Sequence, residues 1–506
     1  MTNKRRPYRK DSPDGEKGYK AMLISELTKK IECTVIGGDA DIARIEYDSR
    51  RVQPGDLFCC INGTFKDGHE YADGAVKAGA AALLVERELP LPVPQIVVKN
   101  SRKAMAELAI EFYGHPLDGI PVIGITGTNG KTTTTYMVKS IAEKAGYKVG
   151  LIGTIRNLIG DKIIPTERTT PESVELQRVF RMMRDEGVNL IVMEVSSHAL
   201  DQDRVHGIEF VIGGFTNLTQ DHLDYHKTFD NYLAAKKIMF RRSKFAVVNA
   251  DDVHSDMLLD GLNLPAIRYG VRADRADLRA ANIEICPENI EFDLICTMGM
   301  QHITVPIPGL FNVFNALLAA GICQKLGISL SKIAAGLASV VSVSGRMETL
   351  PTEGFDFSVI LDFAHTPDGL ENLLTSVREF AKARIITVFG CGGDRDNTKR
   401  PIMGETAARH SDICVVTSDN PRTEDPIRII KMVLEGVERT ECPHVVIENR
   451  REAIRYALSI AKKDDIVVLA GKGHEYYQEI NGVKHPFDEK IIVAELLEEM
   501  RENGGN

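Results

Sequence analysis

The stretch GITGTNGKTTTTY, residues 124–136, constrains the fold of this chain more than any other part of the sequence. Apolar residues lead into it, glycine and threonine dominate it, and Lys131 follows its last glycine. Beyond Lys131, apolar residues recur at the spacing of a helix face, so the stretch predicts a strand, a loop and a helix. The free N–H groups and the positive dipole end of a helix N-terminus favour phosphate. Lys131 adds a positive charge, and Thr132 offers a hydroxyl to Mg²⁺.

The spacing of the glycines departs from that of an ordinary P-loop. Five residues separate Gly124 from Gly130, where the usual loop has four. Gly127 and Gly130 still allow the backbone to approach a ligand closely. The altered spacing therefore argues against an ordinary motor or GTPase, but not against phosphate binding. The alternative is a glycine-rich turn without a ligand.

Length and charge limit the class of protein. A chain of 506 residues predicts about three domains. The net charge of −9, with no basic block beyond KRRPYRK near the N-terminus, argues against a nucleic-acid partner. Nine scattered cysteines without a CxxC motif indicate reduced thiols. Neither a spanning apolar run nor a signal peptide is evident, so we expect a cytoplasmic protein without a membrane partner.

Alternating strand and helix patterns predict an α/β fold throughout. We expect a polar, disordered tail over residues 1–21 and a small α/β domain over 22–117. A central domain with a mostly parallel sheet would span 118–345, and a doubly wound domain 346–506. The proline-bearing connection 115–121 marks the first boundary.

Individual elements follow from the same patterns. The expected strands are 56–61, 81–85, 190–193, 210–213, 245–248, 358–361, 385–389, 413–417, 444–447 and 466–469. The expected helices include 72–78, 232–240 and 312–326, and residues 278–308 predict an antiparallel sheet edge.

Two further patterns suggest metal ligands. Glu194 ends an apolar strand, where its carboxylate can hold Mg²⁺ or, on local grounds equally well, cap the next helix. His222 and His226 have the i, i+4 spacing of a zinc-binding helix. No glutamate stands beside the first histidine and no third ligand is evident, so we do not expect zinc. Mg²⁺ prefers oxygen ligands, so chemistry alone does not make His222 a ligand.

Two patterns favour ordinary interpretations when taken alone. Lys236 and Lys237 lie in an amphipathic helix, and their spacing favours two solvated lysines. The glycine-rich segment 389–393 follows a strand, but Arg395 occupies the third glycine position of a dinucleotide fingerprint. We therefore exclude NAD.

The segment TGTNGKTT, residues 126–133, resembles the nucleotide loop of the Mur ligases and folylpolyglutamate synthetases, which are ATP-dependent amide-bond ligases. Loops of that family have this glycine spacing, and the resemblance extends from Met22 to Leu497. It implies that ATP contacts Gly127, Thr128, Asn129, Gly130, Lys131, Thr132 and Thr133. GLFNVFN, residues 309–315, resembles GxFNxxN and would bring Asn312 and Asn315 to the base, although Asn312 can also be a helix cap.

The resemblance also implies metal and catalytic residues. Thr132, Glu194 and His222 would bind Mg²⁺, and Lys236, at the lysine of the family motif Tyr-x-x-Ala-Lys, would be carbamylated and become an oxygen ligand. Arg346, Asp362 and His365 resemble elements that the C-terminal domain brings to ATP. Catalysis would depend on Lys131, His222, Lys236 and Arg346.

Substrate residues follow from the resemblance to the Mur ligase that adds the third residue of the peptide. Ser49, Thr169, Thr170, Ser196, Gln202 and Arg204 match positions that contact the UDP-linked substrate. Arg395, Asp419, Asn420, Pro421, Arg422, Gly471 and Glu475 match positions for meso-diaminopimelate. The chemistry agrees, since a fixed arginine can bind the extra carboxylate that lysine lacks. Without the resemblance, DNPR would be interpreted as surface ion pairs.

The resemblance thus implies a monomeric enzyme that uses ATP and Mg²⁺ to join meso-2,6-diaminopimelate to UDP-N-acetylmuramoyl-L-alanyl-D-glutamate through an acyl phosphate. The alternatives are the same reaction with L-lysine, a folylpolyglutamate synthetase, and a P-loop switch or transport ATPase. Arg422 argues against lysine. The uridine-site motif and DNPR argue against the folate enzyme, and the amino-acid residues of the last third argue against a switch.

Overall fold

The computed structural model describes residues 20–63, 66–166, 168–286, 289–340 and 344–504. Most of the predicted tail, residues 1–19, lies outside this description. The chain forms two compact units. The first contains the chain up to Val122 with Thr170–Asn189 and Ser196–Glu209, and the second contains the remainder.

The first unit is built on a five-stranded sheet in the order β2-β7-β6-β5-β4. Four neighbouring strands run parallel, and β2 pairs antiparallel with β7. The strands are β2 (Thr34–Ile36), β4 (Arg44–Glu46), β5 (Asp56–Cys59), β6 (Ala82–Val85) and β7 (Gln95–Val97), with a separate pair β1 (Met22–Leu23) and β3 (Asp41–Ile42). The helices are α1 (Ile24–Leu27), η1 (Gly68–Tyr71), α2 (Ala72–Lys77), α3 (Ser101–Phe112), α5 (Ser173–Asp185) and α6 (Ser197–Asp201).

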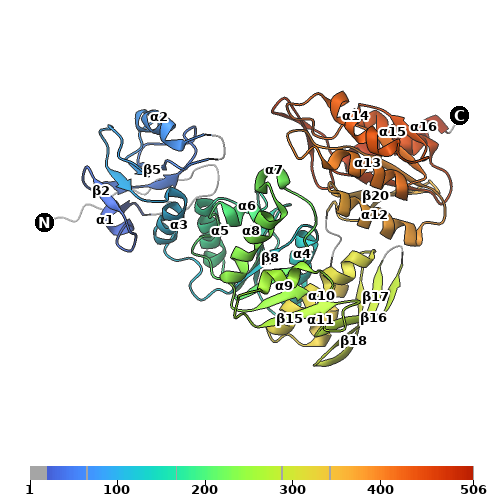
Figure 1. The fold of residues 1–506 in the computed structure, drawn as a ribbon, viewed down its shortest axis with the longest axis horizontal. Coiled ribbons are helices and arrows are strands. Elements are labelled where there is room, and N and C mark those ends of the chain that lie inside the picture. Colours follow the sequence, from blue (N-terminus) through green and yellow to red (C-terminus); the bar gives the residue numbers. More distant parts are fainter. Residues whose placement is uncertain (1–19, 64–65, 167, 287–288, 341–343, 505–506) are drawn as a thin grey trace. The chain divides into compact units, whose positions relative to one another are not determined.

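An eleven-stranded sheet forms the centre of the second unit, in the order β11-β10-β9-β12-β8-β13-β14-β15-β16-β17-β18. Its strands are β8 (Val122–Thr126), β9 (Val149–Ile152), β10 (Asn157–Ile159), β11 (Lys162–Ile164), β12 (Leu190–Glu194), β13 (Ile212–Phe215), β14 (Ala246–Asn249), β15 (Ala266–Gly270), β16 (Leu278–Ile285), β17 (Ile290–Cys296) and β18 (Gly299–Val305). The run from β8 through β13 to β16 is parallel. As predicted, β16, β17 and β18 form an antiparallel edge (Figure 1).

Helices cover both faces of this sheet. On one face, Ile123 and Ile125 belong to the same core as α4 (Lys131–Lys144), α10 (Leu310–Lys325) and α11 (Leu330–Ala338). On the other face, a Cβ on Gly124 would lie 3.0 Å from Met239 of α8 (Phe229–Arg241). The remaining helices are α7 (Leu223–His226) and α9 (His254–Leu259). Alternate residues of β8 thus serve opposite faces, as expected for a strand covered on both sides.

The last sheet has the order β19-β20-β24-β21-β22-β23 and is parallel from β20 to β23. Its strands are β19 (Glu348–Leu350), β20 (Ser358–Asp362), β21 (Ile385–Phe389), β22 (Ile413–Val416), β23 (His444–Val446) and β24 (Ile466–Ala470). Ile386 and Val388 pack on the side of α15 (Arg450–Ile460) and α16 (Glu489–Gly504). Ile385 and Phe389 belong to the core of α12 (Pro367–Phe380), α13 (Lys399–His410) and α14 (Pro426–Val437). A hairpin of β25 (Tyr477–Ile480) and β26 (Val483–Pro486) follows β24.

The predicted α/β class is confirmed, with three sheets of the expected kinds. One strand is misplaced in the sequence prediction: the expected strand 210–213 is observed as β13 at Ile212–Phe215, and Phe210 makes only an isolated bridge with Ser243. No helix in the described parts of the chain is both long and apolar enough to cross a bilayer.

Candidate active site

The glycine-rich loop joins β8 to α4, as the sequence predicts. Gly127 and Gly130 have φ values of 146° and 83°, in the region that favours glycine. A Cβ on Gly127 would lie 1.8 Å from the Thr216 hydroxyl oxygen, and one on Gly130 would lie 2.3 Å from Asn315 Oδ1. Both positions therefore require glycine for space as well as for conformation. The backbone N–H groups at the start of α4 remain available for an anion.

Two lysine ammonium groups converge on this loop. Lys131 Nζ donates to the carbonyl oxygens of Gly127 (2.9 Å) and Thr128 (2.7 Å). Lys236 Nζ, from α8, donates to the same Gly127 carbonyl at 2.9 Å. Only 1% of Lys236 is exposed, so its interpretation as a solvated lysine is wrong. Its burial and the nearby Lys131 charge hold the pKa of the Lys236 amine well below its ordinary value.

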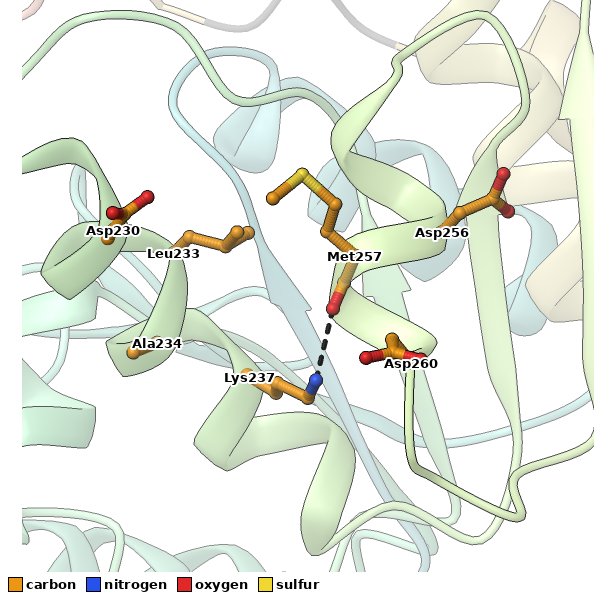
Figure 2. A pocket seen from close by; sticks show the side chains of 7 residues that line it. All are labelled: Asp230, Leu233, Ala234, Lys237, Asp256, Met257 and Asp260. Carbon is orange, nitrogen blue, oxygen red and sulfur yellow. Dashed lines mark hydrogen bonds between the residues drawn. The ribbon is translucent and has the colours of Figure 1, made fainter.

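Tyr232 contacts both Lys236 and the glycine-rich loop. The Tyr232 hydroxyl lies 3.1 Å from Thr128 Oγ1, and Lys236 Nζ lies 4.3 Å from the Tyr232 ring centroid. The next residue on α8, Lys237, has a different environment. It lines a pocket between α8 and α9 and donates to the Met257 carbonyl at 3.1 Å (Figure 2). The two neighbouring lysines thus differ completely in surroundings.

Glu194, at the end of β12, is fully buried beside the loop. Its carboxylate accepts hydrogen bonds from the Thr132 hydroxyl (3.0 Å) and from the backbone N–H (2.8 Å) and hydroxyl (2.9 Å) of Thr154. Ser196, and not Glu194, caps α6, so the capping alternative is wrong. A carboxylate and a hydroxyl are hard oxygen donors, which fit Mg²⁺. No group of three or more His, Cys, Asp or Glu side chains placed to hold a metal occurs within the described ranges.

His222 adopts a left-handed conformation (φ 56°) immediately before α7. The helix begins only at Leu223, so His222 and His226 do not share a regular zinc-binding helix. His222 Nε2 lies 3.3 Å from Asp221 Oδ2, and Lys399 Nζ lies 3.8 Å from Asp221 Oδ1. Burial of Asp221 would raise its pKa, but the charges of His222 and Lys399 outweigh that effect and lower it.

The two asparagines of the GxFNxxN-like segment pack against the loop. Thr134 Oγ1 donates to Asn315 Oδ1 at 3.3 Å, and Asn315 Nδ2 donates to Asn312 Oδ1 at 3.0 Å. Asn312 Nδ2 donates in turn to the Pro308 carbonyl at 2.7 Å. Gly309 occupies the N-cap position of α10, so Asn312 is not its cap. Both asparagines are buried, and Asn315 is the one that contacts the residues of the loop and the first turn of α4.

Residues of the last third also contact this region. Asn129 Nδ2 donates to Asp368 Oδ2, at the start of α12, at 2.6 Å. Asp362 ends β20 and accepts from the backbone N–H groups of Met347 and Ala364, each at 2.7 Å. The Arg346 guanidinium lies over the Phe363 ring, and its buried Nε has no hydrogen-bond partner among the described residues. That donor is available for a ligand oxygen.

His365 is expected to remain neutral throughout the physiological range. Its burial lowers its pKa to about 4, and the Lys399 charge acts in the same direction. The exposed His302 differs, because its hydrogen bond with Asp293 (3.1 Å) raises its pKa. In an NMR titration from pH 8 to about pH 5, we expect the His365 imidazole shifts to stay constant, whereas His302 gains its proton above about pH 6.5.

Histidine-to-glutamine variants at the two positions would assign the resonances. A His365 midpoint near that of an ordinary histidine would contradict the burial that the structure gives it.

The predicted amino-acid residues lie on loops at the carboxyl ends of β21, β22 and β24. Arg422 has a left-handed backbone (φ 51°), and its N–H donates to the Glu479 carbonyl at 3.0 Å. Its side chain donates to the Gly393 carbonyl (2.6 Å) and lies 3.4 Å from the Glu479 carboxylate. Arg395 remains exposed to solvent, but its partial desolvation, reinforced by the Arg422 charge, lowers its pKa. The guanidinium groups of Arg395 and Arg422 are therefore close enough for the charge of Arg422 to act on Arg395.

Asn420 connects the two loops of this region. Its Nδ2 donates to Glu475 Oε2 at 2.8 Å. Gly471 has φ 115°, and a Cβ there would lie 2.6 Å from Asp419 Oδ2. Asp419, Asn420 and Pro421 are buried, so the interpretation of DNPR as surface ion pairs is wrong for these three residues.

In the first unit, four of the predicted UDP-substrate residues lie together. Ser196 N–H donates to Thr170 Oγ1 at 3.1 Å, and Arg204 donates to the Thr170 carbonyl (3.1 Å) and to Gln202 Oε1 (2.6 Å). Ser49 lies in the turn after β4. Thr169 belongs to the second unit, where its hydroxyl accepts from Thr154.

Several polar residues of the site were missed by the sequence interpretation. They are Asp221, Asp368, Lys399, Lys472 and Glu479. Each lies within a few positions of a motif residue; four of them follow a strand or lie at the start of a helix, and Glu479 lies in β25 of the hairpin. Extending each motif by a few polar positions would have identified them.

Comparison with known proteins agrees with this geometry. Three family models match: the Mur ligase family catalytic domain over residues 41–113, the Mur ligase middle domain over 125–323, and the Mur ligase glutamate ligase domain over 345–473. The chain belongs to the Mur ligase family, whose members are ATP-dependent ligases.

The similar proteins carry a more specific name. A protein of Clostridium acetobutylicum, UDP-N-acetylmuramoyl-L-alanyl-D-glutamate–2,6-diaminopimelate ligase 1, is 49% identical over 95% of this chain and 100% of its own. The 2,6-diaminopimelate ligase of Geobacillus thermodenitrificans is 48% identical over 92% of this chain and 96% of its own. A solved structure of a ligase with that name has a TM-score of 0.63 and 31% identity, over 91% of this chain and 96% of that one.

Proposed function

We propose that this protein joins meso-2,6-diaminopimelate to UDP-N-acetylmuramoyl-L-alanyl-D-glutamate at the expense of ATP, in the synthesis of peptidoglycan precursors. The relatives named above support this reaction. The observation that carries it is the hydrogen bond from Asn420 to Glu475, because Arg422 belongs to the same loop as Asn420. The Glu475 carboxylate and the Arg422 guanidinium are thus contributed by two loops that are joined by this hydrogen bond.

These two groups match the free end of diaminopimelate. The Glu475 carboxylate, with Asp419 and Gly471 beside it, would accept the ammonium group. Arg422 and Arg395 would bind the carboxylate that lysine lacks, because a guanidinium binds carboxylates in a bidentate manner. In the described structure Glu479 lies against Arg422, so the substrate carboxylate would compete with Glu479 or share Arg422 with it.

The phosphate loop would hold ATP for transfer of its terminal phosphoryl group. The N–H groups at the start of α4 and the Lys131 ammonium would bind the phosphates, Asn312 and Asn315 would lie near the base, and Asp362 and His365 would flank the nucleotide. The D-glutamate γ-carboxylate oxygen forms a bond to phosphorus as the bond to ADP breaks. The neutral amine of diaminopimelate then attacks the acyl carbon, the bond from that carbon to the phosphate oxygen breaks, phosphate leaves, and the nitrogen releases a proton as the amide forms. Arg346 would stabilise charge on the transferring group.

Mg²⁺ would be held by Thr132, Glu194 and His222, with Lys236 as a carbamate, and would neutralise charge on the phosphates. The environment of Lys236 supports this modification. A neutral amine attacks CO₂, a nitrogen–carbon bond forms, and a proton leaves. The lowered pKa of the buried Lys236 favours the neutral amine. The product would replace an ammonium with oxygen donors next to the phosphate loop, where Lys236 Nζ contacts the Gly127 carbonyl.

The remaining predictions extend this proposal. Ser49, Thr169, Thr170, Ser196, Gln202 and Arg204 would contact the UDP-linked substrate. We propose domain limits at residues 22–117, 118–345 and 346–506. We further propose that the enzyme acts in the cytoplasm as a monomer, without a nucleic-acid or membrane partner.

The test is phosphate release from ATP in the presence of the UDP-linked dipeptide, with meso-diaminopimelate or L-lysine offered in parallel. We expect release that requires both the dipeptide and diaminopimelate, with little release from lysine. A preference for lysine would leave the ligase reaction intact but contradict the role of Arg422. Release that needs neither acceptor nor dipeptide would instead indicate an ATPase.

A further inference from the structure

A lysine side chain is enclosed between the two loops of the amino-acid region. Lys472 is the second residue after β24, and its side chain has 0% exposure. Its ammonium donates to Asn420 Oδ1 (3.1 Å) and Glu475 Oε2 (3.3 Å), and lies 3.5 Å from Asp419 Oδ1. Lysine is rarely fully buried unless it is paired. All three partners belong to the residues that we propose for diaminopimelate, but Lys472 itself was not among them.

The hydrogen bonds of Lys472 fix the orientation of Glu475. Asn420 Oδ1 accepts from both Lys472 and the Glu479 N–H (2.9 Å), so its amide nitrogen must point toward Glu475. Oε2 of Glu475 therefore receives one hydrogen bond from Asn420 and one from Lys472. Two donors on one carboxylate oxygen define its position and leave the other oxygen for a ligand.

Lys472 also balances the charge of this region. Asp419 and Glu475 are two carboxylates in a buried setting, where each disfavours ionisation of the other. The other buried cation, Arg450, is already paired with Glu489 at 2.7 Å, and both of those side chains have 0% exposure. Lys472 is therefore the cation that contacts both Asp419 and Glu475. The charged or titratable groups that surround them from the packed elements are His365, Cys391, Arg422, Arg450, Tyr477, Glu479 and Glu489.

The pKa values agree with this balance. Burial raises the pKa of Glu475, the Asp419 charge raises it further, and Lys472 opposes both effects. Burial alone would raise the pKa of Asp419, but the charges of Lys472, Arg450 and Arg422 hold it below its ordinary value. Removing the Lys472 charge would therefore bring protonation of this carboxylate pair to a higher pH.

We propose that Lys472 is a positioning residue for the amino-acid acceptor: it holds Glu475 charged and correctly oriented to receive the ammonium group of the substrate. This role rests on the proposed ligase function. Lys472 acts through Glu475 and makes no contact with the phosphate loop in the described structure. Its loss should therefore affect acceptor binding and leave phosphoryl transfer intact.

The test compares Lys472→Met with Lys484→Met, the same change at an exposed lysine of the adjacent hairpin. We expect KM for diaminopimelate to rise about 30-fold or more in Lys472→Met. The acid limb of kcat/KM for diaminopimelate should move to higher pH, because Glu475 without the Lys472 charge is protonated at a higher pH. KM for ATP and the trapping of the acyl phosphate by hydroxylamine, which needs no amino acid, should stay unchanged. Lys484→Met should behave as wild type in every assay.

A double variant tests whether Lys472 acts through Glu475. Lys472→Met added to Glu475→Gln should raise KM little beyond Glu475→Gln alone, since coupled residues are non-additive. An unchanged KM and pH profile in Lys472→Met would overturn the proposal, and so would loss of acyl-phosphate trapping, which would indicate a general structural role. A wild-type enzyme without diaminopimelate-dependent ligation would overturn the proposed function instead.

Discussion

Replacing Lys131 with alanine is expected to reduce ligation by about 10³-fold or more. The Lys131 ammonium lies inside the phosphate loop, where it donates to the Gly127 and Thr128 carbonyls. Its positive charge there would stabilise negative charge on the transferring phosphoryl group. The residues that follow Lys131 in the first turn of α4 are threonines, which carry no charge that could replace it. Initial rates of phosphate release with all three substrates at saturation would measure the loss.

The fold should survive this change, because Lys131 is only partly buried and Gly127 keeps its hydrogen bond from Lys236. Lys144→Ala, at an exposed lysine near the end of the same helix, is the matched control and should leave the rate unchanged. Near-normal activity of Lys131→Ala would exclude the phosphate role of the loop lysine. Circular dichroism of both variants would separate a folding defect from a catalytic one.

Replacing Arg422 with alanine is expected to weaken diaminopimelate binding by about 2–5 kcal/mol, which corresponds to about 30-fold or more in Kd. The Arg422 side chain is held by the Gly393 carbonyl and by Glu479. Its removal deletes the cation for the substrate carboxylate and leaves the Glu479 charge beside it. Isothermal titration with diaminopimelate, in the presence of the UDP-linked dipeptide and a non-hydrolysable ATP analogue, would give the affinity.

Two variants sharpen this measurement. Arg422→Lys keeps a positive charge but loses the planar pair of donors, so we expect an intermediate loss of affinity. Arg428→Ala removes an exposed guanidinium from α14 and should not change binding. Equal affinity of wild type and Arg422→Ala would rule out contact between Arg422 and the substrate carboxylate.

Periodic features of the sequence predicted the fold well. The strand, loop and helix around Lys131, the antiparallel edge formed by β16–β18 and the parallel strands of the last sheet all appear where apolar periodicity placed them. These features depend on local alternation and on glycine, both of which can be recognised without knowledge of tertiary contacts. The boundaries of β13 moved by two residues, because Phe210 packs against Gly124 and pairs only through an isolated bridge with Ser243 that lies outside the strand.

Burial of charged side chains could not be predicted from spacing. Lys236 and Lys237 are adjacent and chemically identical, yet one is buried against the Gly127 carbonyl and the other lines a pocket (Figure 2). The family resemblance, and not the helical period, singled out Lys236. Lys472 lies between the motif residues Gly471 and Glu475, but no local pattern predicted its burial, since its enclosure depends on two loops that are far apart in the sequence. Long-range packing therefore determines the site details that local patterns leave open.

The glycines of the phosphate loop also restrict how this enzyme can evade a drug. A methyl group at Gly127 or Gly130 would collide with Thr216 or Asn315 at distances that real Cβ atoms essentially never show. A substitution at either glycine would force the Thr216 or Asn315 side chain to move and would also strain a backbone conformation that favours glycine. An inhibitor whose contacts are confined to the backbone at these two glycines would therefore face positions where a resistance substitution also disturbs the loop that the enzyme itself needs.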